Sequence, residues 1–174
     1  MEAAVRERCL KLLAQQPRTR AELERSLARA GAPEDAVAAA LDRLTHVGLI
    51  DDTAYAQAYV RTGVGVRRRG TRNLKAELRG RGVAPEIIDL AAAEVDEEDE
   101  RATALALARR RAQSLARLEP QVRRRRLTGL LLRRGFSGSV VSDVLAEVLS
   151  DPVWDESGGF SALDEDEVPL SSDA

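Results

Sequence analysis

Arginine is the residue type in this 174-residue chain whose spacing most clearly suggests a chemical role. Its planar guanidinium group makes paired hydrogen bonds with phosphates and carboxylates, in a geometry that lysine does not match. A coding bias toward arginine over lysine would explain the residue type but not its clustering. The candidate binding residues form two clusters, the first made of Arg67, Arg68, Arg69, Arg72, Lys75, Arg79 and Arg81 and the second of Arg123, Arg124, Arg125, Arg126, Arg133 and Arg134. We predict that the clusters bind a partner protein or a nucleic acid.

Part of the first cluster has helical spacing. Arg68, Arg72, Lys75 and Arg79 stand at i, i+4, i+7 and i+11, which predicts one stripe along the fifth helix of the chain. The leucines between them would face the core. The second cluster falls on the eighth expected helix.

The sequence offers little for catalysis or metal binding. His46 is its only histidine and Cys9 its only cysteine, which excludes a site built from several Cys and His ligands. Residues 63–70, GVGVRRRG, lack the lysine and the following Ser or Thr of a phosphate-binding P-loop. The acidic runs at 97–100 and 164–167 fit a helix start and a solvated tail better than a metal site. We expect no catalytic residue, no cofactor, no metal and no enzymatic activity.

The net charge of −2 conceals a division along the chain. Residues 151–174 contain eight acidic residues and no Lys or Arg, whereas the first 150 residues have a net charge of +6. The last segment shows no apolar period, and we expect an acidic, disordered tail at 151–174. No apolar run approaches the length of a membrane span, and the N-terminus lacks the apolar region of a signal peptide. We expect a cytoplasmic protein without a membrane segment.

Ala, Leu, Arg and Glu dominate the composition, which favours an all-α protein. Helices are expected at 3–15, at 52–62 and at about 121–134, with 63–70 as a connection rich in Gly and Arg. Thr19 and Glu22 fit a capping box, and Pro33 is expected as the first residue of the third helix.

The chain repeats itself around three glycines, Gly31, Gly82 and Gly135. Four apolar columns recur at fixed distances from them: Leu23, Leu74 and Leu127; Leu27, Leu78 and Leu131; Val37, Ile88 and Val141; and Leu44, Val95 and Val148. Such periodicity is typical of helical repeats, which bury their apolar faces against neighbours. We predict three tandem three-helix repeats at 1–50, 51–96 and 97–150 that form an elongated, curved array.

The stretch 49–59, LIDDTAYAQAY, joins the first two predicted repeats. Asp51 and Asp52 can cap free N–H groups at a helix start, and Tyr55 and Tyr59 lie on one helical face. The plain interpretation is that the tyrosines pack in the core or between helices. The sharper interpretation is that this motif fixes the angle between two repeats.

These segments together resemble the RecX family of regulators of the bacterial RecA recombinase, over about residues 15–150. The matching residues are Leu49, Ile50, Asp51, Asp52, Tyr55 and Ala56, then Gly70, then Arg134, Gly135, Phe136 and Ser137. The resemblance implies three tandem three-helix repeats. It also implies a protein that binds in the groove of the RecA–DNA filament. We further expect a monomer, whose partners are the RecA filament and single- or double-stranded DNA. Inhibition of the ATPase, strand-exchange and coprotease activities of RecA is implied as well, in DNA repair, homologous recombination and the SOS response.

Other interpretations stay open on the sequence alone. Residues 21–51 look like the helix-turn-helix half of a winged-helix transcription regulator, but a wing would need a β-hairpin after Ile50, where the pattern is helical. A helical-repeat scaffold or an enzyme is a third interpretation. The absence of a catalytic set argues against the enzyme, and the basic clusters argue against an inert scaffold.

Overall fold

The computed structural model describes residues 2–150, and the predicted disordered tail lies outside this range. The described residues form nine α-helices and no strand, which confirms the predicted all-α fold. Their bounds are α1 Glu2–Gln15, α2 Arg20–Arg29, α3 Glu34–His46, α4 Asp52–Gly65, α5 Thr71–Gly80, α6 Pro85–Ala93, α7 Glu97–Ser114, α8 Pro120–Arg134 and α9 Gly138–Ser150. Within residues 2–150, no helix combines the length and apolar character that crossing a membrane requires.

Each set of three helices has its own apolar core. One cluster lies within α1–α3, a second within α4–α6 and a third within α7–α9, and we name these units repeats 1, 2 and 3. Eleven of the twelve residues in the four predicted apolar columns are buried, and the twelfth, Val95, is half-buried. The glycine alignment therefore identified the core correctly.

Local capping explains most of the helix ends. The predicted capping box is confirmed, since the Thr19 side chain accepts from the Glu22 N–H and the Glu22 carboxylate accepts from the Thr19 N–H. The three alignment glycines have φ between +75° and +91°, a left-handed conformation that ends a helix cheaply only with glycine.

Two predicted boundaries are wrong. The fourth helix does not end at about Thr62 but continues to Gly65. Within its last turn Gly63 packs against the Leu74 side chain so closely that a Cβ would overlap that side chain. Pro33 is the N-cap of α3 and not its first residue, whereas Pro85 does begin α6.

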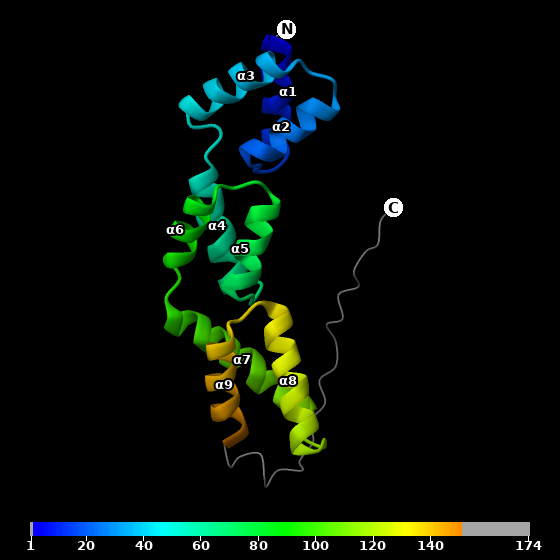
Figure 1. The fold of residues 1–174 in the computed structure, drawn as a ribbon, viewed down its shortest axis with the longest axis vertical. Coiled ribbons are helices and arrows are strands. Elements are labelled where there is room, and N and C mark those ends of the chain that lie inside the picture. The colour runs from blue at the N-terminus through cyan, green and yellow to red at the C-terminus, as the bar shows by residue number, and fades with distance from the viewer. Residues whose placement is uncertain (1, 151–174) are drawn as a thin grey trace.

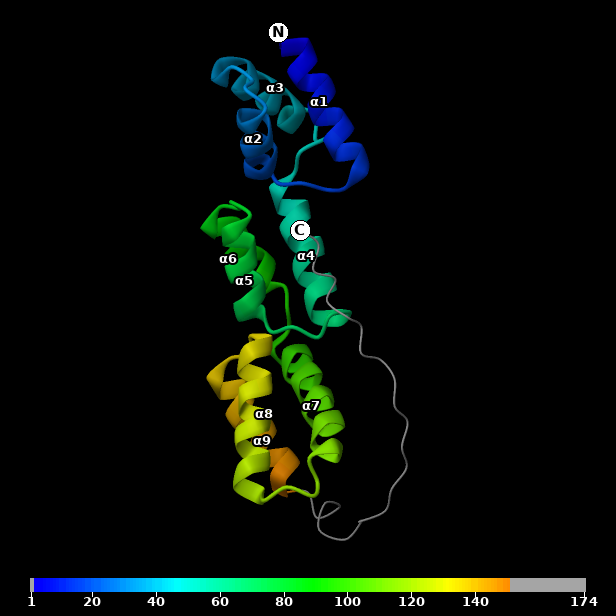
Figure 2. The same cartoon turned by 90° about the vertical axis from the view of Figure 1, so that its right-hand side faces the viewer.

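The repeats follow one another along the long axis of the molecule, so the described chain is elongated (Figure 1). Figure 2 shows α2, α5 and α8 in line along one side and α1, α4 and α7 along the other. The junctions between repeats are therefore made largely by helix ends.

Candidate partner-binding surfaces at the repeat junctions

The first junction joins the end of α5 to the start of α2. The Thr19 hydroxyl donates to the carbonyl oxygen of Arg81 at 2.8 Å, and the Arg81 guanidinium pairs with Glu22 at 2.6 Å. From repeat 2, the Asp52 carboxylate accepts the backbone N–H of Arg20 at 2.9 Å. The Asp52 carboxylate thus accepts a free backbone N–H at the positive end of α2, and the negative end of α5 lies beside the same end of α2.

The second junction repeats this arrangement one unit further along. The Gly70 N–H donates to the carbonyl oxygen of Arg134 at 2.9 Å, and the Asn73 amide donates to that of Arg133 at 2.7 Å. From repeat 3, Glu100 accepts the Thr71 N–H at 2.9 Å and is itself buried. At both junctions the end of the second helix of one repeat therefore lies on the start of the second helix of the repeat before it. The first helix of the later repeat adds a carboxylate to this contact.

The second junction also brings the two predicted arginine clusters together. The Arg134 guanidinium donates to the carbonyl oxygen of Arg67 at 3.2 Å, and the Arg72 N–H donates to Gly135 at 3.2 Å. The side chains of Arg67, Arg72, Arg133 and Arg134 are exposed, and none forms an ion pair with another of residues 2–150. We name these four residues the basic junction surface, since their exposed guanidinium groups have no carboxylate partner among the described residues.

The prediction of one continuous stripe on the fifth helix is wrong. Arg68 lies in the connection before α5, which begins only at Thr71, and its backbone has φ of 49°. Lys75 pairs with Asp89 at 2.9 Å. Arg72, Lys75 and Arg79 lie on α5, and of these three Arg72 and Arg79 are exposed and have no partner carboxylate in the described chain.

Two further members of the first cluster are held inside the molecule. Arg69 makes two hydrogen bonds to the Glu77 carboxylate, and Arg81 pairs with Glu22. These arginines connect helices and have less freedom to bind a partner.

The second cluster is divided between the two ends of α8. Arg133 and Arg134 lie at the second junction, while Arg124, Arg125 and Arg126 are exposed near the opposite end. Arg123 is half-buried, and its Nε has no hydrogen-bond partner among the described residues. The second arginine cluster is thus divided between two separate surfaces.

The predicted Asp and Tyr motif lies at the first junction. The rings of Tyr55 and Tyr59 stack with centroids 6.0 Å apart, and the Arg81 guanidinium lies 5.2 Å from the Tyr59 centroid. Asp51 caps its own helix, accepting the Ala54 N–H at 2.9 Å, whereas Asp52 reaches the start of α2. A role of this motif in fixing the angle between repeats stays a prediction.

Glu77 is a connecting residue that sequence reasoning missed. It accepts the Tyr59 hydroxyl at 2.5 Å as well as the Arg69 guanidinium. Its position as the only acid within the first arginine cluster was the available signal. Burial by itself raises the pKa of Glu77, but the hydrogen bonds from Tyr59 and Arg69 outweigh it, so the pKa is lowered from the ordinary 4.5.

We expect Tyr59→Phe to weaken the acid dependence of folding. Because the pKa of Glu77 is lower in the folded state, the carboxylate stabilises the fold at pH values above its ordinary pKa of 4.5. This stabilisation is lost as the pH falls through the lowered pKa of the folded state. Removing the hydroxyl should reduce the difference in unfolding free energy between neutral and acidic pH by about 1 kcal/mol. Urea unfolding across this pH range measures the effect. Tyr55→Phe is the matched control, and an equal change in both variants would contradict the assignment to Glu77.

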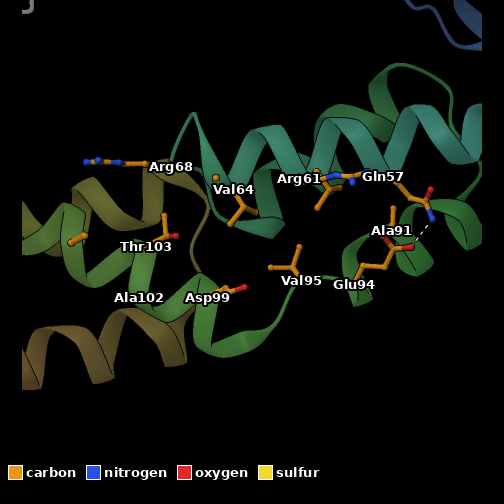
Figure 3. A pocket seen from close by; sticks show the side chains of 13 residues that line it. Gln57, Arg61, Val64, Arg68, Ala91, Glu94, Val95, Asp99, Ala102 and Thr103 are labelled. Atoms are coloured by element: carbon orange, nitrogen blue, oxygen red, sulfur yellow. Dashed lines mark hydrogen bonds between the residues drawn. The ribbon is translucent and has the colours of Figure 1, made fainter.

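Two grooves open beside the junctions. One, of about 580 Å³, lies between repeats 1 and 2 and is lined by both tyrosines, Arg67 and Arg81. The other, of about 670 Å³, lies between α4 on one side and α6 and α7 on the other (Figure 3). The sequence predicted Arg68 as a binding residue but gave no signal of this groove, because its lining residues come from α4, α6, α7 and the connections after α4 and α6. Across residues 2–150, no three metal-ligating side chains converge.

Family models of the three RecX domains match this chain repeat by repeat. The first RecX three-helix domain matches residues 6–44, the second 51–91 and the third 97–145. The chain belongs to the RecX family.

Curated RecX proteins are similar over most of their length. The regulatory protein RecX of Mycolicibacterium vanbaalenii is 43% identical over 149 residues, which cover 82% of this chain and 81% of that protein. The regulatory protein RecX of Thermobifida fusca is 40% identical over 147 residues, covering 84% of this chain and 80% of that protein. The chain is therefore a RecX-type regulatory protein.

Solved RecX structures share the fold. The crystal structure of RecX from Lactobacillus salivarius superposes with a TM-score of 0.80 at 24% identity, covering 84% of this chain and 96% of that one. A second crystal structure of regulatory protein RecX superposes with a TM-score of 0.74 at 29% identity, covering 82% of this chain and 70% of that one. Where a winged-helix regulator would need a β-hairpin after Ile50, this RecX-family chain has α4.

Proposed function

We propose that this RecX-family protein binds the RecA–DNA filament and inhibits its ATPase, strand-exchange and coprotease activities. In this proposal it acts by binding and not by catalysis, as a monomer in the cytoplasm, within DNA repair, homologous recombination and the SOS response. Family membership over three consecutive repeats supports the regulatory role.

The observation that carries the proposal is the basic junction surface. Its four exposed guanidinium groups come from two repeats and have no carboxylate partner among the described residues. Guanidinium groups of this kind bind acidic protein loops and DNA phosphates through charge-assisted hydrogen bonds. The elongated array can in addition contact more than one subunit of a filament, which a compact domain of the same size could not.

RecA ATPase activity on single-stranded DNA tests the proposal. We expect strong inhibition when the protein is added well below one molecule per RecA, since one bound array would affect several subunits. The protein should also bind DNA weakly in the absence of RecA, with an affinity that falls as salt rises. Unchanged ATPase activity at equimolar protein would contradict the proposed function.

A further inference from the structure

The groove between repeats 2 and 3 has an apolar floor. Val64 of α4, Val95 after α6 and Ala102 of α7 line it, and its volume of about 670 Å³ falls within the range of sites that bind organic groups. In Figure 3 the Val64 side chain on α4 and the Val95 side chain in the connection after α6 point toward the space between the two sides of the groove. The groove can therefore hold several aliphatic side chains from another molecule.

The two edges of the groove carry opposite charges. Arg61 and Arg68 lie along the α4 edge, and Glu94 and Asp99 lie along the edge formed by α6 and α7 (Figure 3). All four are exposed, and none forms an ion pair with another residue of the range 2–150. Gln57 donates to Glu94 at 2.5 Å across one end of the groove. A polyanion such as DNA would be repelled by the acidic edge, so the charge pattern fits a protein better than a nucleic acid.

The backbone at Arg68 is strained in a way that suggests a role for its side chain. Arg68 is the one non-glycine residue within 2–150 that has positive φ, at 49°. Glycine would adopt this conformation without a steric penalty, yet the position holds a long cationic side chain at the edge of the groove. Strained backbone of this kind is found preferentially at functional sites.

We propose that this groove binds an amphipathic helix of RecA. Its apolar face would rest on the floor, its acidic side chains would face Arg61 and Arg68, and a basic side chain would face Asp99. Grooves between helices commonly bind helical segments in this way. The inference rests on the proposed function and assigns the groove to protein contact, which leaves the basic junction surface for DNA phosphates or acidic loops.

Filling the groove tests the proposal. Ala102 is exposed on its floor, so Ala102→Trp should block the groove without entering the core of repeat 3. The concentration for half-inhibition of RecA ATPase should rise about tenfold or more, since a blocked apolar anchor removes a central part of an interface. The matched control is Ala38→Trp, at an exposed position of α3 away from both grooves, and it should inhibit like the parent.

Arg68→Gly separates binding from folding. The melting temperature should stay equal or rise, because glycine relieves the positive φ, while half-inhibition should need about tenfold more protein because a charged contact is lost. If the parent inhibits RecA and Ala102→Trp inhibits equally well, the groove proposal is overturned and the proposed function stands. A parent protein without effect on RecA would overturn both. If Ala102→Trp weakened binding to single-stranded DNA alone as much as binding to the filament, the groove would be a nucleic-acid site and the proposal would also fail.

Discussion

The triple variant Arg72→Glu, Arg79→Glu and Arg133→Glu is expected to lose inhibition of the RecA filament. All three side chains are exposed and unpaired within residues 2–150, and two of them lie on one face of α5. Each lost charge-assisted contact costs about 1.5–3 kcal/mol, so half-inhibition should need at least about 100-fold more protein. Any affinity for DNA should fall, with a shallower dependence on salt, since the slope follows the number of phosphates neutralised.

The matched control reverses Arg6, Arg8 and Lys11 on α1. These residues are exposed as well, and the one ion pair of Lys11, with Glu7, is itself largely exposed and worth little. Both triple variants should keep the circular dichroism of the parent, because exposed substitutions change stability by about 0.5 kcal/mol or less each. If both variants inhibited RecA like the parent, the arginines of α5 and α8 would be no more than a solvated surface.

Gly70→Ala is expected to destabilise the second repeat junction strongly. A Cβ at Gly70 would overlap the carbonyl group of Gly135 and the backbone nitrogen of Phe136. Because the obstacle is backbone, repeats 2 and 3 would have to separate and lose the hydrogen bonds from Gly70 to Arg134 and from Arg72 to Gly135. Overpacking and two lost hydrogen bonds together predict a loss of about 3 kcal/mol in unfolding free energy.

Chemical denaturation and amide hydrogen exchange at residues 70–73 measure this loss. Gly80→Ala is the control, since it lies in the last turn of α5 with nothing within 4 Å of an added Cβ. Its unfolding free energy should stay the same or rise by up to about 1 kcal/mol, because alanine is the better helix former. A Gly70→Ala protein as stable as the parent would show that the second junction can accommodate the added Cβ without losing stability, and would contradict this prediction.

Much of the architecture follows from local pattern. Leucines four apart, a glycine at the end of each middle helix and a capping box at Thr19 act over a few residues, so their effect can be predicted without knowing the fold. Because this local pattern occurs three times, the sequence also predicts that the helices are arranged in three repeats. The misplaced end of the fourth helix shows the limit, because local pattern placed its end in the glycine-rich segment, where the helix in fact continues to Gly65 and Gly63 packs closely on Leu74 of α5.

The candidate surfaces depended on contacts that no local pattern encodes. The sequence predicted one stripe of four basic residues, yet Lys75 is paired with Asp89, and Arg68 lies in the connection before α5. The groove beside Arg68 combines residues of α4, α6, α7 and two connections, and the order of these residues in the sequence gives no signal that they converge.

By itself the sequence determined the all-α class, the three repeats, the core positions and the resemblance to RecX, because helix formation and core burial depend on residue type at short spacing. Tertiary structure decided which arginines are free to bind. Arg81 is held by Glu22, which lies 59 residues away in the sequence, while Arg67 and Arg134 meet across 67 residues. Ion pairing depends on the distance between charges in space, and for residues so far apart in the chain only the stacking of the repeats sets that distance.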